Sequence, residues 1–182
     1  MALLTAVVVG CSLWFVMPMA SQAASTAKPS KGKAAEFIVS ESQFNQMFPN
    51  RNSFYTYSGL TAALDAYPGF ANTGSDTVKK QEAAAFLANV SHETGGLVHV
   101  VERDAAVAWK TGLWYWNTQS GPGTMTPHDA MVNGAGFGET IRAINGSLEC
   151  NGGNPGQVQS RVDKYKQFAA LLGVPPGDNL SC

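Results

Sequence analysis

Apolar positions recur at helical spacing through most of residues 36–182, and they predict a helical domain. The pattern is clearest from Val78 to Ser91, where Ala84, Leu87 and Val90 fall on one face and good helix formers lie between them. A face of this kind is buried against other helices, since the polar positions between the apolar ones face water.

Five further helices follow from the same spacing, from capping residues and from prolines that end a helix. They are a short helix that Ser40 caps and Pro49 ends, Tyr57 to Ala66, Ala105 to Asn117 behind the cap Asp104, Phe137 to Ile144, and Pro155 to Leu172. No stretch predicts a convincing sheet or an internal repeat, and glycine-rich loops separate the later helices. The expected fold class is all-α, or α with minor β.

The predicted helix from Ala105 to Asn117 is apolar on nearly every side. A helix with that pattern is normally buried in a core. We therefore expect its tryptophans, Trp109, Trp114 and Trp116, to be core residues rather than platforms that bind a ligand at the surface.

The first 35 residues differ from the rest. Residues 2–20 are apolar, and Ser21-Gln22-Ala23 is a small-x-small pattern, which predicts a secretory signal peptide over residues 1–23. An uncleaved membrane anchor is the alternative, and Pro18 and the cleavage pattern argue against it. Residues 24–35, rich in Ser, Lys, Ala and Pro, predict a disordered linker. The expected product is a secreted, extracellular domain of residues 36–182 with no membrane partner.

The charge of this domain excludes one class of partner. All 13 acidic residues lie at or after Glu36, but only nine of the 12 basic residues do, so the domain carries a net charge of −4. Nucleic-acid-binding domains are basic, so nucleic acid is excluded as the expected partner. A negative domain is compatible with a neutral polymer as its ligand, because a neutral ligand needs no opposite charge on the protein. We also expect the domain to be a monomer.

Cysteine and histidine usage predicts one disulfide and no metal. Cys150 and Cys182 form an even pair in a secreted chain, which implies a bridge between them. The histidines show no metal-ligand spacing, and His92-Glu93 lacks the second histidine of a metalloprotease, because that position is Gly96. We therefore expect neither a metal nor a cofactor.

Two acids flank a glycine turn and are the candidate catalytic pair. Glu93 ends the helix that starts near Val78, Gly95-Gly96 follow, and Glu102 comes nine residues after Glu93. One continuous helix separates such positions by roughly 13.5 Å and a strand by about 30 Å. Inverting glycoside hydrolysis needs carboxyl groups about 6.5–9.5 Å apart, so the chain must bend back at the glycines.

The glycines accept the positive φ values of such a bend, and three valines then favour an extended return: Val98, Val100 and Val101. Spacing alone, however, favours a plainer interpretation, in which a solvated helix end is followed by an ordinary loop.

Four ordered blocks resemble a glycoside hydrolase family 19 chitinase of the bacterial type. They are residues 44–49 with 54–57, residues 82–96, residues 108–116 and residues 136–162. Together they cover nearly everything from Glu41 to Cys182. The resemblance implies a lysozyme-like, mainly helical fold with a sugar-binding cleft, and endo-hydrolysis of β-1,4-linked N-acetylglucosamine in chitin with inversion and without a cofactor.

The same resemblance assigns roles to matching residues. It implies that Glu93 is the general acid and Glu102 the general base that activates water. Glu149 and Arg161 resemble a buried pair that interacts with the acid, where an arginine between two carboxylates would compensate their charge. A purely structural ion pair is the alternative for Glu149 and Arg161.

Three residues are expected at the substrate: Asn145, His92 and Thr94. Asn-Gly is itself a turn signal, so turn chemistry is the alternative for Asn145. His92 is expected as a supporting or core residue rather than as the base, because a helix points neighbouring side chains about 100° apart.

The resemblance breaks after Glu102. The family normally continues with a further segment, including a cysteine-containing loop and a Tyr-Gly-Arg-Gly-Pro-Ile-Gln-Leu-Ser motif, before the block that begins at Ala108. Here Glu102-Arg103-Asp104 runs directly into Ala105. The missing residues hold the attacking water and grip the sugar, and their loss could expose apolar surface on neighbouring helices.

Three hypotheses follow. The first is a secreted endo-chitinase whose activity the internal deletion impairs. The second is a non-catalytic remnant that binds chitin. The third is a hydrolase that cleaves peptidoglycan, since a lysozyme-like cleft accepts alternating amino sugars. No separate carbohydrate-binding module is evident, so crystalline chitin is expected to be a poor substrate.

Overall fold

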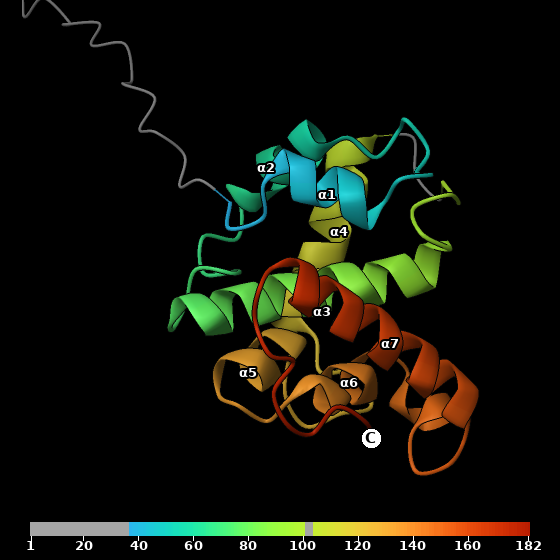
Figure 1. Ribbon diagram of the computed structural model, residues 1–182. Helices are drawn as coiled ribbons and strands as arrows, with labels where there is room; N and C mark the ends of the chain where they lie inside the picture. Colours follow the sequence, from blue (N-terminus) through green and yellow to red (C-terminus); the bar gives the residue numbers. More distant parts are fainter. Residues whose placement is uncertain (1–36, 101–103) are drawn as a thin grey trace, which may run out of the picture. The chain divides into compact units, whose positions relative to one another are not determined.

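The computed structural model describes residues 37–100 and 104–182, and every regular element among them is a helix (Figure 1). In chain order the helices are α1 (Glu41–Met47), α2 (Tyr57–Leu64), α3 (Asp76–Thr94), α4 (Ala105–Thr118), α5 (Pro127–Val132), α6 (Phe137–Glu149) and α7 (Pro155–Leu171). The predicted mainly helical class is confirmed. The predicted signal peptide and linker lie outside the described residues.

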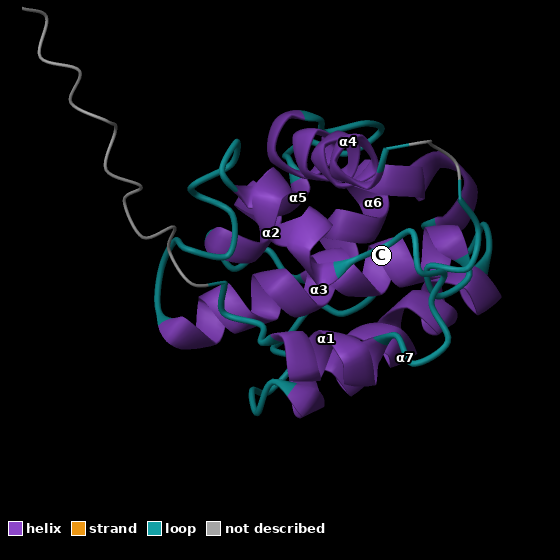
Figure 2. Cartoon of the chain, turned by 90° about the horizontal axis from the view of Figure 1, so that it is seen from above, coloured by secondary structure: helices purple, strands orange, loops and turns teal. Residues whose placement is uncertain are grey.

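Helix α3 runs through the centre of this helical domain (Figure 2), with α1, α2 and α4 on one side and α5 and α6 on the other in the view of Figure 1. The hydroxyl of Ser75 caps its first turn by accepting a hydrogen bond from the backbone N–H of Val78. Helix α7 packs along α3. This packing brings residues of α7 next to the carboxyl end of α3, although about 70 residues separate them in sequence.

Aromatic rings connect the helices of the core. The ring of Phe86 on α3 lies 5.5 Å from Trp116 and 6.4 Å from Trp109, both on α4, and 5.1 Å from Phe70. Offset and edge-to-face pairs of this kind add to the stability that apolar burial provides. Trp109 and Trp116 are therefore core residues, as the sequence predicts.

The outer face of α4 does not follow that prediction. Trp114 is 48% exposed and Val107 is 46% exposed. The expectation of a helix buried on every side is wrong, because no described element covers this face. The apolar residues of α4 thus extend onto a face of the helix that no described part of the chain buries.

The other differences from prediction concern short elements and helix ends. Helix α5 was not predicted, because its six residues are too few to show a periodicity; it begins at a Thr126 cap with Pro127 in the first turn. Helix α6 continues to Glu149, past the predicted end at Ile144, through a kink at Asn145. Helix α2 ends at Leu64.

The C-terminal segment is tied to α6. The predicted disulfide between Cys150 and Cys182 is present, with the two Cα atoms 5.0 Å apart. The backbone N–H of Gly138 donates to the carbonyl of Asn179 at 2.8 Å. A Cβ atom on Gly138 would overlap the carbonyl oxygen of Ser181, so this close approach requires glycine.

Candidate active site

Glu93 lies in the last turn of α3, where two glycines end the helix. Gly95 and Gly96 have φ values of 61° and 81°, and the N–H of Gly96 donates to the carbonyl of Ser91 at 2.7 Å. Glycine adopts this left-handed conformation without the steric cost that a Cβ atom brings. The predicted glycine bend after Glu93 is confirmed.

The extended return after the bend is not seen at Val98. The chain stays in a turn, where Leu97 also has a positive φ of 65° and Val98 and His99 both donate to the carbonyl of Thr94 at 3.1 Å. The β preference of valine is outweighed here by the hydrogen bonds that this carbonyl accepts. Val101 and the predicted base Glu102 lie outside the described residues.

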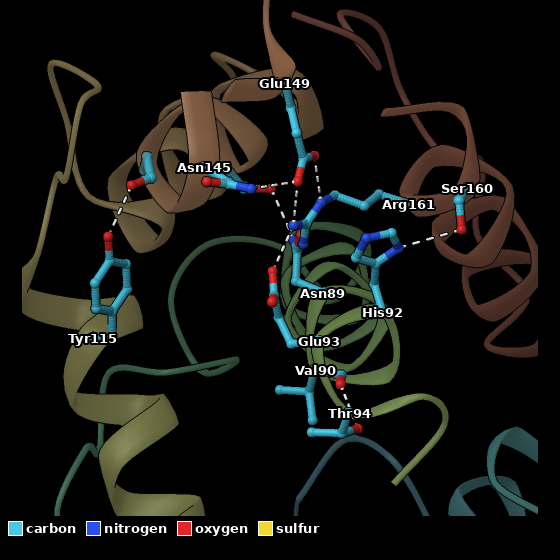
Figure 3. Close-up of polar contacts among 12 residues, drawn as sticks. Asn89, Val90, His92, Glu93, Thr94, Tyr115, Asn145, Glu149, Ser160 and Arg161 are labelled. Atoms are coloured by element: carbon cyan, nitrogen blue, oxygen red, sulfur yellow. Dashed lines mark hydrogen bonds and ion pairs between the residues drawn. The ribbon is translucent and has the colours of Figure 1, made fainter. Parts of the chain in front are cut away.

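Arg161 on α7 links the end of α3 to the end of α6 (Figure 3). Its Nε donates to Oε2 of Glu149 and its Nη2 to Oε1 of Glu149, both at 2.8 Å. Nη2 also donates to Oε1 of Glu93. The arginine is 1% exposed and Glu149 is 4% exposed, whereas the Glu93 side chain is 50% exposed. One buried cation thus holds a buried and a half-exposed carboxylate together.

The charges of this pair support each other. Burial alone would raise the pKa of Glu149, but hydrogen bonds from Arg161 and Asn145 outweigh burial and lower it. Burial likewise opposes the charge of Arg161, and its bonds to Glu149 and Glu93 raise the pKa of the guanidinium. Glu149 is therefore ionised at neutral pH.

The side chain of Asn145 forms a hydrogen bond with Glu149. Its Nδ2 donates to Oε1 of Glu149 at 2.7 Å. The backbone of Asn145 is non-helical, with φ −144° and ψ 29°, and this marks the kink of α6. The Asn-Gly signal therefore corresponds to a break within a helix, and the side chain of Asn145 is part of the site's polar network.

Asn89 belongs to the network although sequence reasoning missed it. Its Oδ1 accepts from Nη1 of Arg161 at 3.0 Å, and its Nδ2 donates to the Ala85 carbonyl and to the Thr140 hydroxyl, both at 3.1 Å. The signal was present, because Asn89 precedes Glu93 by four residues on a predicted helix, which puts both on one face.

His92 faces α7, away from Glu93 (Figure 3). Its Nδ1 lies 3.2 Å from Oγ of Ser160. Burial lowers the pKa of His92, and the nearby Arg161 lowers it further. The imidazole is therefore a neutral neighbour of the arginine.

The hydroxyl group of Thr94 both donates and accepts a hydrogen bond within the protein. The hydroxyl donates to the Val90 carbonyl at 2.7 Å and accepts from the N–H of Leu97 at 2.8 Å. In this arrangement Thr94 stabilises the turn that follows Glu93, and it also lines the pocket beside the acid.

A pocket of about 480 Å³ opens between α3 and α4, with Glu93 in its wall. Most of its surface comes from apolar side chains: Phe86, Val90, Ala108, Trp109, Trp116 and Ile144. Five polar side chains complete the wall: Tyr55, Asn89, Thr94, Thr111 and Tyr115. The half-exposed carboxylate of Glu93 therefore meets solvent beside a mainly apolar hollow.

A second buried carboxylate, Glu82, was also missed by sequence reasoning. Its Oε1 accepts from the Trp116 indole at 3.0 Å and contacts Nδ1 of His128 at 2.6 Å, while Oε2 accepts from the N–H of Ala71 at 2.9 Å. The hydrogen bond to Glu82 raises the pKa of His128. This cluster joins α3, α4 and α5, and it supports the pocket wall through Trp116.

The described residues contain neither a cluster suited to a metal ion nor a helix suited to crossing a membrane. Within 37–100 and 104–182, no group of three or more His, Cys, Asp or Glu side chains is arranged to hold a metal ion. Nor does any helix in these ranges have the length and hydrophobicity that crossing a membrane requires.

Comparison with known proteins identifies the family. The sequence profile described as "Chitinase class I", of glycoside hydrolase family 19, matches residues 38–102 and 97–182. The crystal structure of a bacterial family 19 chitinase is 61% identical, with a TM-score of 0.78, and the match covers 80% of this chain and 100% of that one. Chitinase C from Streptomyces griseus is 54% identical, with a TM-score of 0.80 and coverage of 84% and 83%.

A plant relative shows where this chain is short. Endochitinase A of Zea mays is 34% identical over 186 residues, yet these include only 71% of this 182-residue chain and 63% of the relative. The relative therefore has residues in the matched region for which this chain has no counterpart. The family profile divides into two matches that meet at residues 97–102, which places the missing segment there. The chain belongs to glycoside hydrolase family 19, the chitinase family.

Proposed function

We propose that this chain is a secreted, monomeric endo-chitinase that hydrolyses β-1,4 linkages of N-acetylglucosamine by an inverting mechanism with two carboxylates. Glu93 is the general acid and Glu102 the general base. The observation that carries the proposal is the position of Glu93, whose half-exposed carboxylate is bound by a buried arginine and faces an open pocket. Membership of the chitinase family supports the substrate class.

The proposed chemistry is a single displacement. Glu93 gives a proton to the glycosidic oxygen as the bond to the anomeric carbon breaks, and Glu102 takes a proton from the water that attacks the opposite face of the sugar. The sugar inverts in this step. In the proposal Arg161 and Glu149 position Glu93, and Asn145 contacts substrate from the kink in α6. Thr94 lines the path of the sugar beside the acid, whereas His92 supports the site from the side that faces α7.

A non-catalytic chitin-binding remnant is the second candidate, and one observation favours it. The family match breaks at residues 97–102, beside the proposed base. A general base acts only on a water that is held within hydrogen-bond reach. Loss of the groups that hold this water lowers the rate by orders of magnitude even where both carboxylates remain.

Turnover of a soluble chitin hexamer tests the proposal. The unsubstituted chain should release new reducing ends, and the first products should be α-anomers by proton NMR. Glu93→Gln should lower the rate by about 10²–10⁴-fold, because the amide cannot donate a proton as an acid does. Glu102→Ala should have an effect of the same order.

Glu139→Gln is the matched control, since Glu139 is also a glutamate paired with an arginine, Arg142, but lies away from the pocket. Its rate should equal that of the unsubstituted chain. Equal rates for Glu93→Gln and the unsubstituted chain would exclude Glu93 as the acid. Hexamer binding without any turnover would favour the remnant.

A further inference from the structure

The contact between Arg161 and Glu93 depends on how the guanidinium group is oriented. The Glu93 side chain is half exposed, and Arg161 is its one hydrogen-bond partner among the described residues. A guanidinium group is planar and rigid, so fixing two of its nitrogens also fixes the direction of the third. The groups that hold Nε and Nη1 therefore decide where Nη2 points, and with it where the carboxylate of Glu93 lies.

Asn89 and Glu93 bind the two ends of the same guanidinium group. Glu149 holds one edge of this group, through Nε and Nη2, and Asn89 accepts from Nη1 at 3.0 Å. Asn89 precedes Glu93 by four residues on α3, so the two side chains lie about one helical turn apart on the same face. Arg161 thus binds two successive turns of α3 (Figure 3). Asn89 sets the position along α3 at which Nη2 lies opposite Glu93.

The amide group of Asn89 must present its oxygen to Arg161, because a guanidinium group has only donors. The other end of the amide fixes this orientation. Its Nδ2 donates to the carbonyl of Ala85 and to the hydroxyl of Thr140, both at 3.1 Å. A backbone carbonyl is only an acceptor, so a reversed amide would place two acceptors together at Ala85 and two donors together at Arg161.

Thr140, on α6, adds a second constraint on the amide. Its hydroxyl donates to the carbonyl of Phe137 at 2.7 Å, which leaves the hydroxyl oxygen to accept from Nδ2 of Asn89. Asn89 and Thr140 are both buried, so water does not replace either partner, and hydrogen bonds are stronger in such surroundings than in solvent. A series of directed hydrogen bonds therefore connects the first turn of α6 with α3 and with Arg161 on α7.

We propose that Asn89 and Thr140 are positioning residues for the general acid. They orient Arg161 so that its Nη2 binds Oε1 of Glu93. This contact leaves Oε2, to which no described residue donates, as the oxygen that carries the acidic proton toward the sugar.

Asn89 acts through Arg161 and not on the sugar itself. It lies in the wall of the pocket, but both N–H groups of its amide and the amide oxygen are already hydrogen-bonded within the protein. Thr140 is completely buried. The inference rests on the proposed role of Glu93 as the acid, and it adds two residues that contact neither Glu93 nor the substrate directly.

Kinetics with the soluble chitin hexamer test the proposal. Asn89→Leu removes the whole amide at similar size, and Thr140→Val removes only the hydroxyl. The value of kcat should fall about 10–100-fold in Asn89→Leu and about 3–10-fold in Thr140→Val, because a small displacement of a reacting group lowers the rate strongly. KM should change by less than about twofold, since the contacts of the bound sugar remain. Thr140→Ser keeps the hydroxyl and should restore kcat.

Thr61→Val is the matched control. Thr61 also donates to the carbonyl three residues earlier, that of Ser58 at 3.1 Å, but it lies on α2 outside this network. Its kcat should equal that of the unsubstituted chain, and thermal unfolding verifies that each variant is folded. A merely structural role would lower the melting temperatures of Asn89→Leu and Thr140→Val and leave kcat of the folded chains unchanged. That result would overturn the proposal, as would a Thr140→Ser variant as slow as Thr140→Val.

NMR of the Arg161 guanidinium group gives a measurement that needs no turnover. Glu93→Gln should shift the Nη2 resonances, because it removes the charge that Nη2 binds. In the Asn89→Leu background this shift should fall to less than about half, since substitutions at coupled positions are not additive. In the Thr61→Val background it should be unchanged. Equal shifts in all backgrounds would contradict the role of Asn89. If the hexamer is not hydrolysed at all, the proposed function fails, and this measurement alone decides whether Asn89 positions Glu93.

Discussion

Arg161 and Glu149 form a two-pronged ion pair whose members are both almost completely buried, with Nε and Nη2 each 2.8 Å from a carboxylate oxygen. Such a pair is strongly coupled to folding, because either partner alone is a buried charge without compensation. Glu93 and Asn89 bind the same guanidinium. The stability of the domain and the position of the proposed acid thus depend on one side chain.

Replacement of Arg161 by methionine should lower the free energy of unfolding by about 3–5 kcal/mol, since Glu149 would stay buried without its partner. Urea unfolding followed by circular dichroism measures this change. Arg142→Met is the control, because Arg142 pairs with Glu139 three residues away at the surface, where a pair contributes at most about 1 kcal/mol. Similar losses of unfolding free energy in the two variants would show that the buried Arg161 pair stabilises the fold no more than the surface pair does.

The contact between His128 and Glu82 should make stability depend on pH. The folded-state pKa of His128 is raised above its unfolded value of 6.5 by the hydrogen bond to Glu82. A raised histidine pKa stabilises the fold fully below the unfolded pKa, and this contribution disappears as the pH rises through the folded pKa. The stability advantage of the unsubstituted chain over His128→Gln should therefore shrink as the pH is raised from about 5 to about 9.

Taking the difference between these two chains isolates His128. The pKa of His92 is lowered on folding and gives a pH dependence of opposite sign, but His92 is present in both chains and cancels. Urea titrations at several pH values supply the free energies. An advantage that is constant with pH, or that grows as the pH rises, would refute the role of this contact.

Gly138→Ala should destabilise the C-terminal segment. A Cβ atom at this position would overlap the carbonyl group of Ser181, which is backbone and has little freedom to move. We expect a loss of about 1–3 kcal/mol, as for an overpacked site, measured by thermal unfolding. Gly112→Ala, also within a helix, meets only the Phe86 ring at 3.5 Å and should be neutral or slightly stabilising.

Removal of the disulfide should lower stability by about 3–4 kcal/mol, the estimate for a bridge that closes a loop of this length. Cys150 and Cys182 are 32 residues apart, and the double serine variant tests the estimate without a reductant. If its melting temperature equals that of the oxidised chain, the hydrogen bonds that Asn179 and Cys182 accept from Gly138 and Asn151 already hold this segment in place.

The sequence predicted the long helices well because their apolar faces, caps and glycine ends all agree. Ser40, Ser75 and Asp104 each cap a helix in the structure, and Ser40 and Asp104 were identified from sequence. Helix α5 was missed because six residues show no period. The outer face of α4 was wrongly expected to be buried, since periodicity records how apolar a face is and not what covers it.

The candidate site was predicted in part. Glu93, Glu149 and Arg161 were named from motif blocks, and the structure brings them into contact. Asn89 was missed because a buried amide has no sequence signature apart from its helical spacing to Glu93. Glu82 was missed because its three partners come from distant segments, and only the folded chain brings them together.

The two family matches meet in the connection between α3 and α4, not inside a helix. This makes the junction a natural acceptor for a transplanted segment. A chimaera that takes the additional residues of Endochitinase A of Zea mays needs only two joints, one on either side of this connection, and it leaves the residues of α3 and α7 that pack together unchanged in sequence. Comparing the activity of the shortened chain with that of the chimaera would therefore measure what the added segment contributes to catalysis.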